Sequence, residues 1–422
     1  MKLPISIPIP LLLLTTTTLI PTTTLSSPLL PLPLPLGSDP CPALPNNPSL
    51  PADPKLPDPF RFFDTDADAT TKEDFLQCRQ EQVRALFQRY ELGELPPQPE
   101  VVTATFSGPG SGSNTGTLTI NCAERGKQIS FSVSISYPPG KQGPYPAIIA
   151  YGGLSIPLPT DGNIAVITFN NDDLAAQVNA GSRGQGKFYD LYGQNHTAGA
   201  MIAWAWGVSR ILDALEMTAP QANINLDRVG VTGCSRNGKG ALVAGAFDER
   251  IALTIPQESG SGGSACWRLS DAMWDSGQNV QTAREIVTEN VWFSTSFNPY
   301  ASTNVDVLPF DHHMLAGLVA PRGLFVVENT GYEWLGPMSC YGCMKTAQKV
   351  WTALGVEDHM GFSQVGNHLH CQFPASQEKD LFAFVDKFLL DRPANTTGVM
   401  YTDGTFEFDE AQWIDWTVPK LQ

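Results

Sequence analysis

The sequence predicts an α/β fold of the α/β-hydrolase type, a mainly parallel sheet with helices on both faces in a three-layer sandwich. Three observations predict it. Short apolar runs alternate with helical patterns, as in sheets buried on both faces. A strand, a glycine-lined turn and a helix meet at residues 233–239, the layout of a nucleophile elbow with Ser235 in the turn. Histidines follow the last apolar run, where such folds carry their base.

The chain begins with two segments that we expect to lie outside the catalytic core. Residues 1–27 combine Met1-Lys2, a leucine run and a threonine-rich stretch, which is typical of a signal peptide and too short to span a bilayer. Residues 28–55 are rich in proline and are expected to be extended. Residues 56–422 contain neither an internal repeat nor a central linker, so we predict one catalytic domain.

Hydrophobic periodicity predicts the elements of that domain in order. A helical pattern covers residues 72–90, and strands are predicted at 101–106, 117–121 and 128–137. Buried strands are predicted at 147–151, 164–169, 226–232, 251–256, 323–328 and 359–365. Helices are predicted at 198–217, 240–247, 341–354 and 377–390. In a parallel sheet the active site lies at the carboxyl ends of the strands, and Ser235 follows such an end.

Composition favours a secreted protein. The net charge is −16, only 16% of residues are charged and no basic block exists, which disfavours nucleic acid and anionic membranes as partners. Beyond the signal peptide no run of 18 apolar residues occurs, so we expect the mature protein to be soluble. We further expect it to be extracellular and a monomer. Asn195 and Asn395 lie in N-glycosylation sequons.

The eight cysteines behind a signal peptide favour disulfides over metal binding. Cys340 and Cys343 have C-x-x-C spacing, but neither a second such pair nor suitably spaced histidines accompany them. We therefore expect no metal site.

A catalytic serine needs a base, and six histidines are available. His196 lies in a sequon, His312 and His313 precede a short helix where capping or surface exposure is expected, and His359 opens a strand. His368 and His370 remain, directly after the last core strand, where α/β hydrolases place the base.

Cysteine positions favour His370. Cys234 precedes Ser235 and Cys371 follows His370, so a bridge between them would bring serine and histidine together. Closing a loop of about 137 residues would stabilise the fold by several kcal/mol. The alternative is that Cys371 pairs elsewhere and both histidines cap a turn.

The orienting acid is less defined by spacing. Glu258 ends the strand after the nucleophile helix, whereas the usual hydrolase position is one strand later, near Glu328 or Glu333. Spacing alone leaves the two positions almost equal.

Several motifs resemble those of a known family. They are Gly-Cys-Ser-Arg-Asn-Gly-Lys at 233–239, Pro-Gln-Glu-Ser-Gly-Ser-Gly-Gly at 256–263, Gly-Tyr-Glu-Trp-Leu-Gly at 331–336 and His-x-His-Cys at 368–371. From about Cys41 to Leu390 the chain strongly resembles fungal glucuronoyl esterases (4-O-methyl-glucuronoyl methylesterases), a carbohydrate esterase family. The elbow motif departs from G-x-S-x-G at Asn237, and this asparagine belongs to the family pattern.

The resemblance implies an activity and a set of roles. The activity is hydrolysis of esters between 4-O-methyl-D-glucuronic acid side chains of glucuronoxylan and lignin alcohols, without cofactor or metal. The catalytic residues fall on Ser235, His370 and Glu258, and an oxyanion-binding arginine falls on Arg236. The sugar-binding residues fall on Lys239, Gln281, Glu289 and Trp334.

The resemblance also implies the disulfides Cys41–Cys78, Cys234–Cys371 and Cys266–Cys343. Cys122 and Cys340 have no counterpart in it, so they either pair with each other or stay free.

Two other functions are compatible with the residues. One is another plant cell-wall carbohydrate esterase, acting on acetyl xylan or feruloyl esters through the same triad. The other is a non-catalytic wall-binding protein with a decayed hydrolase fold, which the intact Ser, His and Glu candidates disfavour. Neither end of the chain has the short cysteine- and aromatic-rich cassette of an appended cellulose-binding module.

Overall fold

The computed structural model describes residues 41–46, 48–63 and 65–422. The expected signal peptide and residues 28–40 of the proline-rich extension lie outside the described residues. Cys41–Gln422 form one compact unit, and the described part of 41–55 contains no helix or strand.

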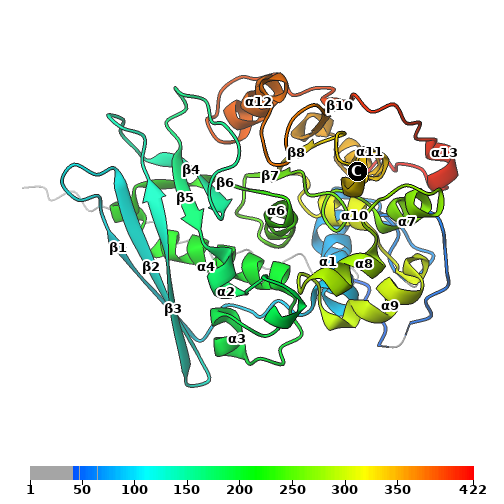
Figure 1. Cartoon of the computed structure of the whole chain (residues 1–422), viewed down its shortest axis with the longest axis horizontal. Coiled ribbons are helices and arrows are strands. Elements are labelled where there is room, and N and C mark those ends of the chain that lie inside the picture. Colours follow the sequence, from blue (N-terminus) through cyan, green and yellow to red (C-terminus); the bar gives the residue numbers. More distant parts are fainter. Residues whose placement is uncertain (1–40, 47, 64) are drawn as a thin grey trace, which may run out of the picture. The chain divides into compact units, whose positions relative to one another are not determined.

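A ten-stranded sheet runs through this unit in the order β1-β2-β3-β5-β4-β6-β7-β8-β9-β10 (Figure 1). The strands are β1 (Val101–Ser107), β2 (Thr115–Glu124), β3 (Lys127–Ser136), β4 (Tyr145–Tyr151), β5 (Ala165–Phe169), β6 (Ile224–Cys234), β7 (Leu253–Gln257), β8 (Gly323–Glu328), β9 (Met360–Gln364) and β10 (Met400–Thr402). The first three strands pair antiparallel, and β3 joins β5 antiparallel. From β5 to β10 every neighbouring pair is parallel. The predicted fold class is confirmed.

Helices precede β1 and, from β5 onward, occupy the segments between the strands. An N-terminal helical stretch joins η1 (Asp74–Arg79), α1 (Gln80–Phe87) and η2 (Gln88–Leu92). The others are α2 (Asn171–Leu174), α3 (Lys187–Tyr192), α4 (Ala200–Met217), α5 (Ala219–Ala222), α6 (Arg236–Phe247), α7 (Trp267–Asp275), α8 (Ala283–Glu289), α9 (Asn298–Thr303), α10 (His312–Gly317), α11 (Pro337–Leu354), α12 (Glu378–Phe388) and α13 (Glu410–Trp413). The helix after the elbow therefore begins at Arg236, four residues earlier than the sequence predicted, and residues 236–239 are its first turn.

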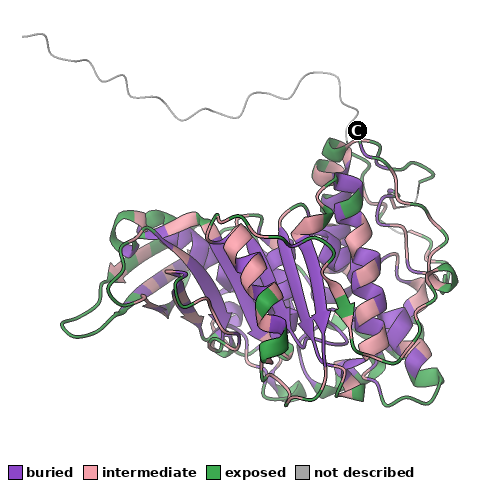
Figure 2. Ribbon diagram, turned by 90° about the horizontal axis from the view of Figure 1, so that it is seen from above, coloured by how far each residue is buried: buried purple, intermediate pink, exposed green. Residues whose placement is uncertain are grey.

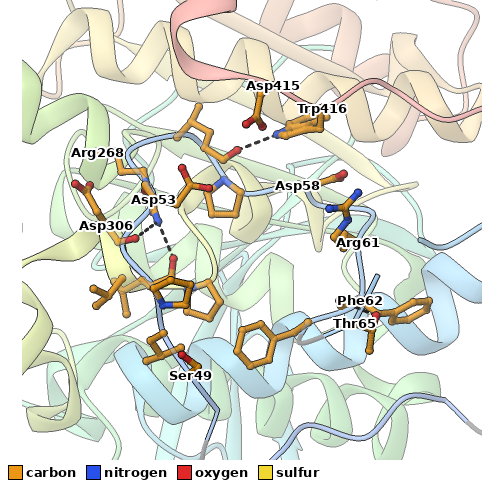
Figure 3. Close-up of a pocket in the computed structure, with 18 of the residues that line it drawn as sticks. Ser49, Asp53, Asp58, Arg61, Phe62, Thr65, Arg268, Asp306, Asp415 and Trp416 are labelled. Carbon is orange, nitrogen blue, oxygen red and sulfur yellow. Dashed lines mark hydrogen bonds between the residues drawn. The ribbon is translucent and has the colours of Figure 1, made fainter. Parts of the chain in front are cut away.

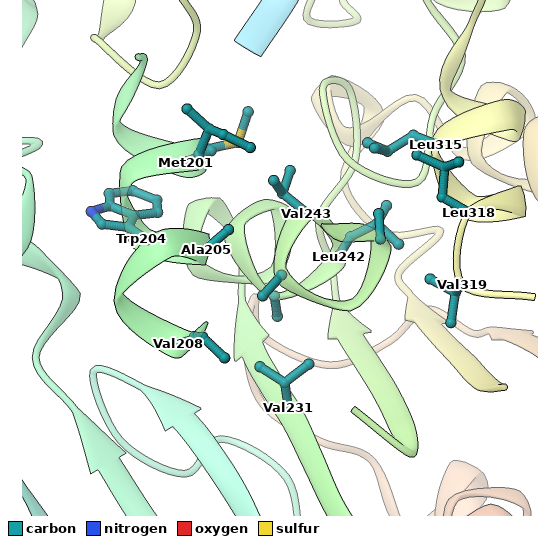
Figure 4. Packing of buried hydrophobic residues seen from close by; sticks show 14 of the residues in the cluster. Met201, Trp204, Ala205, Val208, Val231, Leu242, Val243, Leu315, Leu318 and Val319 are labelled. Atoms are coloured by element: carbon teal, nitrogen blue, oxygen red, sulfur yellow. The ribbon is translucent and has the colours of Figure 1, made fainter. Parts of the chain in front are cut away.

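Two hydrophobic clusters pack against the two faces of the sheet. On one face, Val231 of β6 lies beneath Trp204 of α4 and Leu242 of α6, and α10 adds Leu315 (Figure 4). On the other face, α12 contributes Phe384 to a second cluster. The central strands are buried almost throughout (Figure 2). This burial on both faces explains why their sequences are continuous apolar runs.

The described chain contains three disulfides, Cys41–Cys78, Cys234–Cys371 and Cys266–Cys343. These are the pairs that the resemblance implied. Cys122 and Cys340 are free and buried. None of the described helices has the length and apolar character needed to cross a membrane.

Candidate active site

Ser235 lies at the carboxyl end of β6 and immediately before α6. Its backbone has φ 60° and ψ −129°, a conformation that non-glycine residues rarely adopt and that accumulates at functional sites. Its amide donates to the carbonyl of Gln257 at 2.9 Å, which fixes the turn against β7. The first amides of an α-helix lack intrahelical partners, so the start of α6 presents free donors beside this hydroxyl.

The tight packing of the elbow depends on glycines two residues before and three residues after the serine. A Cβ at Gly233 would lie 2.5 Å from the carbonyl oxygen of Asn237, and one at Gly238 would lie 2.7 Å from that of Gln257. The side chain of Asn237 itself turns toward the neighbouring strand and donates to the carbonyl of Tyr151 at 3.3 Å. The close approach therefore occurs at Gly238, which explains why the second glycine of G-x-S-x-G is dispensable here.

His370 and Glu258 form a close pair on loops that follow β9 and β7. The distance from His370 Nδ1 to Glu258 Oε2 is 2.6 Å, and the amide of Cys371 donates to the same oxygen at 3.1 Å. Glu258 has φ 44° and Cys371 has φ 64°, so both loops bend through left-handed conformations next to the pair. The Glu258 side chain is fully buried and that of His370 is 25% exposed. A buried carboxylate on Nδ1 is the arrangement that orients a catalytic imidazole.

This pairing defines the tautomer of His370. With Nδ1–H donating to Glu258, neutral His370 carries its free lone pair on Nε2. Nε2 is buried and makes no hydrogen bond in the structure, so no bond joins it to the Ser235 hydroxyl. Catalytic hydrogen bonds are often long before substrate binds. The disulfide between Cys234 and Cys371 links the residue before Ser235 to the residue after His370, and the Cα atoms of the two cysteines are 5.7 Å apart.

His368 occupies a different environment. Its Nε2 lies 3.0 Å from the carbonyl of Val365, and its Nδ1 is 3.8 Å from Glu258 Oε1, beyond hydrogen-bond distance. The ring is almost completely buried. It therefore packs beside the carboxylate without the direct contact that His370 makes.

Glu328, the alternative acid, stabilises the loop that carries Glu258. Its Oε1 accepts from the amide of Ser259 at 2.8 Å, from the amide of Gly260 at 3.1 Å and from the hydroxyl of Ser264 at 2.5 Å. Burial raises its pKa, and the hydrogen bonds oppose that rise. Glu333 is exposed in a short helix after β8. The structure places neither of these two carboxylates on His370.

Lys239 is buried beneath the same loop. Its Nζ donates to the carbonyls of Ser259 and Ser261 at 2.5 and 2.6 Å. Burial lowers the pKa of Lys239 to about 8, although the carboxylates of Glu328 and Glu289 act in the opposite direction. The lysine is therefore not a solvated helix residue.

The other residues implied to bind sugar form one connected set. Gln281 Nε2 donates to Glu289 Oε2 at 2.5 Å, and the amide of Gln281 donates to the carbonyl of Trp334 at 3.1 Å. The Trp334 ring lies edge-on to His370, with centroids 4.9 Å apart. Glu289 of α8 is thus linked through Gln281 to the backbone of Trp334, whose ring lies beside the imidazole. Arg236 is exposed at the first position of α6.

One group of potential metal ligands includes the candidate base. Single ligand atoms of Cys234, His370 and Cys371 lie within 4.8 Å of one another. Because the two sulfurs are bonded to each other, neither is a thiolate and the set does not fit a metal ion. Similarly, Cys343 of the C-x-x-C pair is bonded to Cys266.

Figure 3 shows a pocket of about 480 Å³ that is separate from these residues. It is lined by the N-terminal segment around Asp58 and by Trp416 near the C-terminus. The indole of Trp416 donates to the carbonyl of Leu56 at 2.8 Å. None of the candidate catalytic residues lines this pocket.

Comparison with known proteins shows that the chain is similar to glucuronoyl esterases. Residues 120–355 match the family model described as "Glucuronyl esterase, fungi". A 4-O-methyl-glucuronoyl methylesterase of Hypocrea jecorina is 58% identical, with 91% of this chain and 80% of the relative covered. A similarly named enzyme of Wolfiporia cocos is 55% identical, with 87% of this chain and 89% of the relative covered.

Two solved structures have the same fold. The glucuronoyl esterase catalytic domain from Hypocrea jecorina superposes with a TM-score of 0.84, covering 90% of this chain and all of that one at 58% identity. A serine-to-alanine mutant of the Sporotrichum thermophile glucuronoyl esterase, in complex with methyl 4-O-methyl-β-D-glucopyranuronate, also gives 0.84. It is 48% identical and covers 91% of this chain and all of its own.

Proposed function

The chain belongs to the fungal glucuronoyl esterases, and from this premise we propose that it cleaves esters joining 4-O-methyl-D-glucuronic acid side chains of glucuronoxylan to lignin alcohols. It is a carboxylic ester hydrolase that acts on 4-O-methyl-glucuronate esters. The proposal extends this activity to esters carried by the xylan polymer, and it assigns the catalytic and sugar-binding roles to residues of this chain. The 2.6 Å contact between His370 and Glu258, on a loop disulfide-bonded to the elbow, is the observation that carries the assignment.

Ser235 is the proposed nucleophile and His370 its base. As the Ser235 oxygen attacks the ester carbonyl, His370 Nε2 takes the hydroxyl proton, and Glu258 stabilises the imidazolium that forms. The bond from the carbonyl carbon to the lignin alkoxy oxygen then breaks, and His370 returns the proton to the departing alcohol. A water molecule, deprotonated by the same imidazole, cleaves the glucuronoyl-serine ester and regenerates the hydroxyl.

The oxyanion of each tetrahedral intermediate is stabilised at the start of α6. Backbone amides of the first turn supply donors, and Arg236 adds a formal positive charge from the same turn. Removing one such donor costs a serine protease about 2.7–4 kcal/mol of transition-state stabilisation. Arg236 is exposed in the free enzyme, so it can approach the substrate without leaving an ion pair in the core.

Lys239, Gln281, Glu289 and Trp334 are the proposed sugar-binding residues. Together they offer a cation, an amide and a carboxylate to hydroxyl groups, and an indole face to a pyranose ring. Because Trp334 lies against the His370 ring, a sugar stacked on it is held next to the base.

The enzyme is proposed to be a secreted monomer. Its three disulfides are typical of proteins folded in an oxidising compartment. Asn195 and Asn395, the proposed glycosylation sites, are both exposed.

The assignment is tested with Ser235→Ala. We expect this variant to lose at least 10³-fold in kcat on the methyl and benzyl esters of 4-O-methyl-glucuronic acid while still binding the product acid. Acetyl xylan and a feruloyl ester serve as comparison substrates for the wild type. Retained turnover by the variant would remove Ser235 from the mechanism, and faster cleavage of either comparison substrate would reassign the acyl group.

A further inference from the structure

The distribution of tryptophans points to a second site. Trp204, Trp206, Trp267, Trp292 and Trp351 are buried core residues. Trp334 lies beside His370, and Trp416 donates to the carbonyl of Leu56. The remaining two are Trp274 near the end of α7, which is 43% exposed, and the partly exposed Trp413 at the end of α13. Trp413 also packs against the edge of the main hydrophobic cluster, and both indoles line the same cavity.

The cavity has a volume of about 340 Å³, and we call it the α7–α13 pocket. Besides the two tryptophans, it is lined by Asp271 and Asp275 of α7 and by Arg284 of α8. A flat apolar ring beside carboxylates and a guanidinium is the combination that a sugar requires, because a pyranose presents C–H groups on its faces and hydroxyls around its edge. Figure 1 shows α7, α8 and α13 on the side of the unit away from β1.

The charges in the α7–α13 pocket favour a neutral sugar over an anion or a metal ion. Burial raises the pKa of Asp271 to about 6, with nearby Asp275 adding to the rise and Arg284 opposing it. A carboxyl group of this kind both donates and accepts hydrogen bonds under mildly acidic conditions, as hydroxyl ligands require. A uronate would be repelled by the lining carboxylates, which include Asp306 as well as Asp271 and Asp275, whereas a cation would meet Arg284.

The position of the pocket relates it to the catalytic site. Arg284 follows Gln281 by only three residues, and Gln281 is bonded to both Glu289 and Trp334. The segment from Gln281 into α8 therefore contributes Gln281 and Glu289 to the proposed glucuronate site and Arg284 to the α7–α13 pocket.

We propose that the α7–α13 pocket is an accessory carbohydrate site that binds neutral xylose units of the xylan main chain while the attached glucuronate ester occupies the catalytic site. Trp274 and Trp413 stack on the sugar rings, and Asp271, Asp275 and Arg284 bind their hydroxyls. This inference rests on the proposed function, because it takes the polymer as the substrate. The pocket adds affinity for the polymer and leaves the chemistry at Ser235 unchanged.

The test compares a small substrate and a large substrate that share the same leaving group. Wild type and Trp274→Ala/Trp413→Ala are assayed on the benzyl ester of 4-O-methyl-glucuronic acid and on the same ester carried by a xylo-oligosaccharide. We expect kcat/KM on the small ester to stay within about twofold. On the oligosaccharide ester we expect KM to rise about tenfold with kcat unchanged. Equal KM values for the two proteins on the oligosaccharide ester would overturn the accessory site.

Control variants separate the site from general effects. Tyr401→Ala removes an aromatic ring that is 52% exposed on β10, outside the pocket, and should change neither KM. Trp274→Phe should recover part of the lost affinity, since it keeps a flat ring. Asp275→Ala changes an exposed residue of the pocket, and it tests the site if the double variant folds poorly.

Binding without turnover gives an independent readout. Calorimetric titration of Ser235→Ala with a xylo-oligosaccharide that lacks uronate should show binding that disappears when Trp274→Ala/Trp413→Ala is added. Binding that persists in that combination would contradict the site. A wild type that hydrolyses neither ester would instead refute the proposed function, so the two failures are distinguishable.

Discussion

The two histidines of the His-x-His-Cys motif differ in what they contact. Nδ1 of His370 is 2.6 Å from the Glu258 carboxylate, whereas Nδ1 of His368 is 3.8 Å from it. His368 is further held by the carbonyl of Val365. Only His370 therefore has the orienting hydrogen bond that a general base needs.

Replacing each histidine by alanine should separate their roles. We expect His370→Ala to lower kcat on the methyl ester by 10³-fold or more, because the proton of Ser235 then has no acceptor. His368→Ala should cost less than about tenfold, through a less rigid Glu258. The measurement is kcat and KM of both purified variants near neutral pH. A larger loss for His368→Ala would reverse the assignment.

Spacing could not choose between the acid candidates because β7 and β8 are neighbours and end at the same edge of the sheet. The choice is made by loop conformation. Glu258 turns toward the base loop with φ 44°, whereas Glu328 ends β8 and binds the amides after Glu258. A positive φ at a glutamate has no signature in the sequence, so only the family resemblance pointed to Glu258.

At the scale of elements, the strands were the best predicted part. The buried strands coincide with short, mostly apolar runs, and all six strands predicted between residues 147 and 365 are present. Strand β10 was missed because it has only three residues and an exposed Tyr401. The short helices α7, α8 and α9 were missed as well, since their packing depends on contacts distant in sequence such as Trp267 with Phe297.

The Cys234–Cys371 disulfide joins the elbow around Ser235 to the loop after β9 that carries the proposed base, His370. On the loop-entropy model, a cross-link spanning 137 residues stabilises the fold by about 5 kcal/mol and one spanning 37 residues by about 4 kcal/mol. The double variants Cys234→Ala/Cys371→Ala and Cys41→Ala/Cys78→Ala should therefore both lose stability in urea titrations. Only the first should also lose kcat, by tenfold or more at a temperature where it stays folded. Equal kcat for both variants would show that the tether does not position His370.

Helix α6 approaches β7 so closely that one contact tolerates no side chain. A Cβ at Gly245 would lie 2.1 Å from Thr254 Oγ1. We expect Gly245→Ala to lower the free energy of unfolding by about 1–3 kcal/mol through overpacking, despite the better helix propensity of alanine. Gly110→Ala is the control, because nothing lies within 4 Å of its Cβ position, and it should stay within about 0.5 kcal/mol of wild type. The measurement is the denaturant concentration at the midpoint of unfolding, compared between variants whose m-values are equal.

At the scale of the whole described unit, the N-terminal segment and the C-terminal segment meet on α10. The amide of Leu56 donates to the carbonyl of Trp413, and the ring of His313 stacks on Trp416 with centroids 6.5 Å apart. His313 Nε2 lies 2.8 Å from the carbonyl of Pro57. The expectation of surface or capping histidines at 312 and 313 was wrong, since both are fully buried. The segments that bury His313 are distant in the sequence, so its neighbours along the chain gave no sign of this.

The pKa values of the adjacent histidines in this junction shift in opposite directions. Burial lowers the pKa of His313 to about 4, and Asp311 only partly opposes it. Burial also acts to lower the pKa of His312, but the buried Glu91 carboxylate, 2.8 Å from its Nε2, outweighs that effect and raises it. In acid, His313 is therefore the member of the pair that must stay neutral for the fold to persist.

The junction should consequently make stability depend on pH through His313. Between pH 6.5 and about 4 the unfolded chain binds a proton at this histidine that the folded chain does not, so the free energy of unfolding falls as pH falls. His313→Gln removes the titration and keeps an amide that can donate to Pro57. Relative to this variant, wild type should lose about 2–3 kcal/mol between pH 7 and 4.5 in urea titrations. The difference between the two proteins cancels other groups such as Asp271, whose raised pKa has the opposite effect in this range. Parallel pH profiles would contradict this account, because they would mean that His313 binds its proton equally well in the folded state, at the Nδ1 that lies 3.7 Å from Cys266 Sγ.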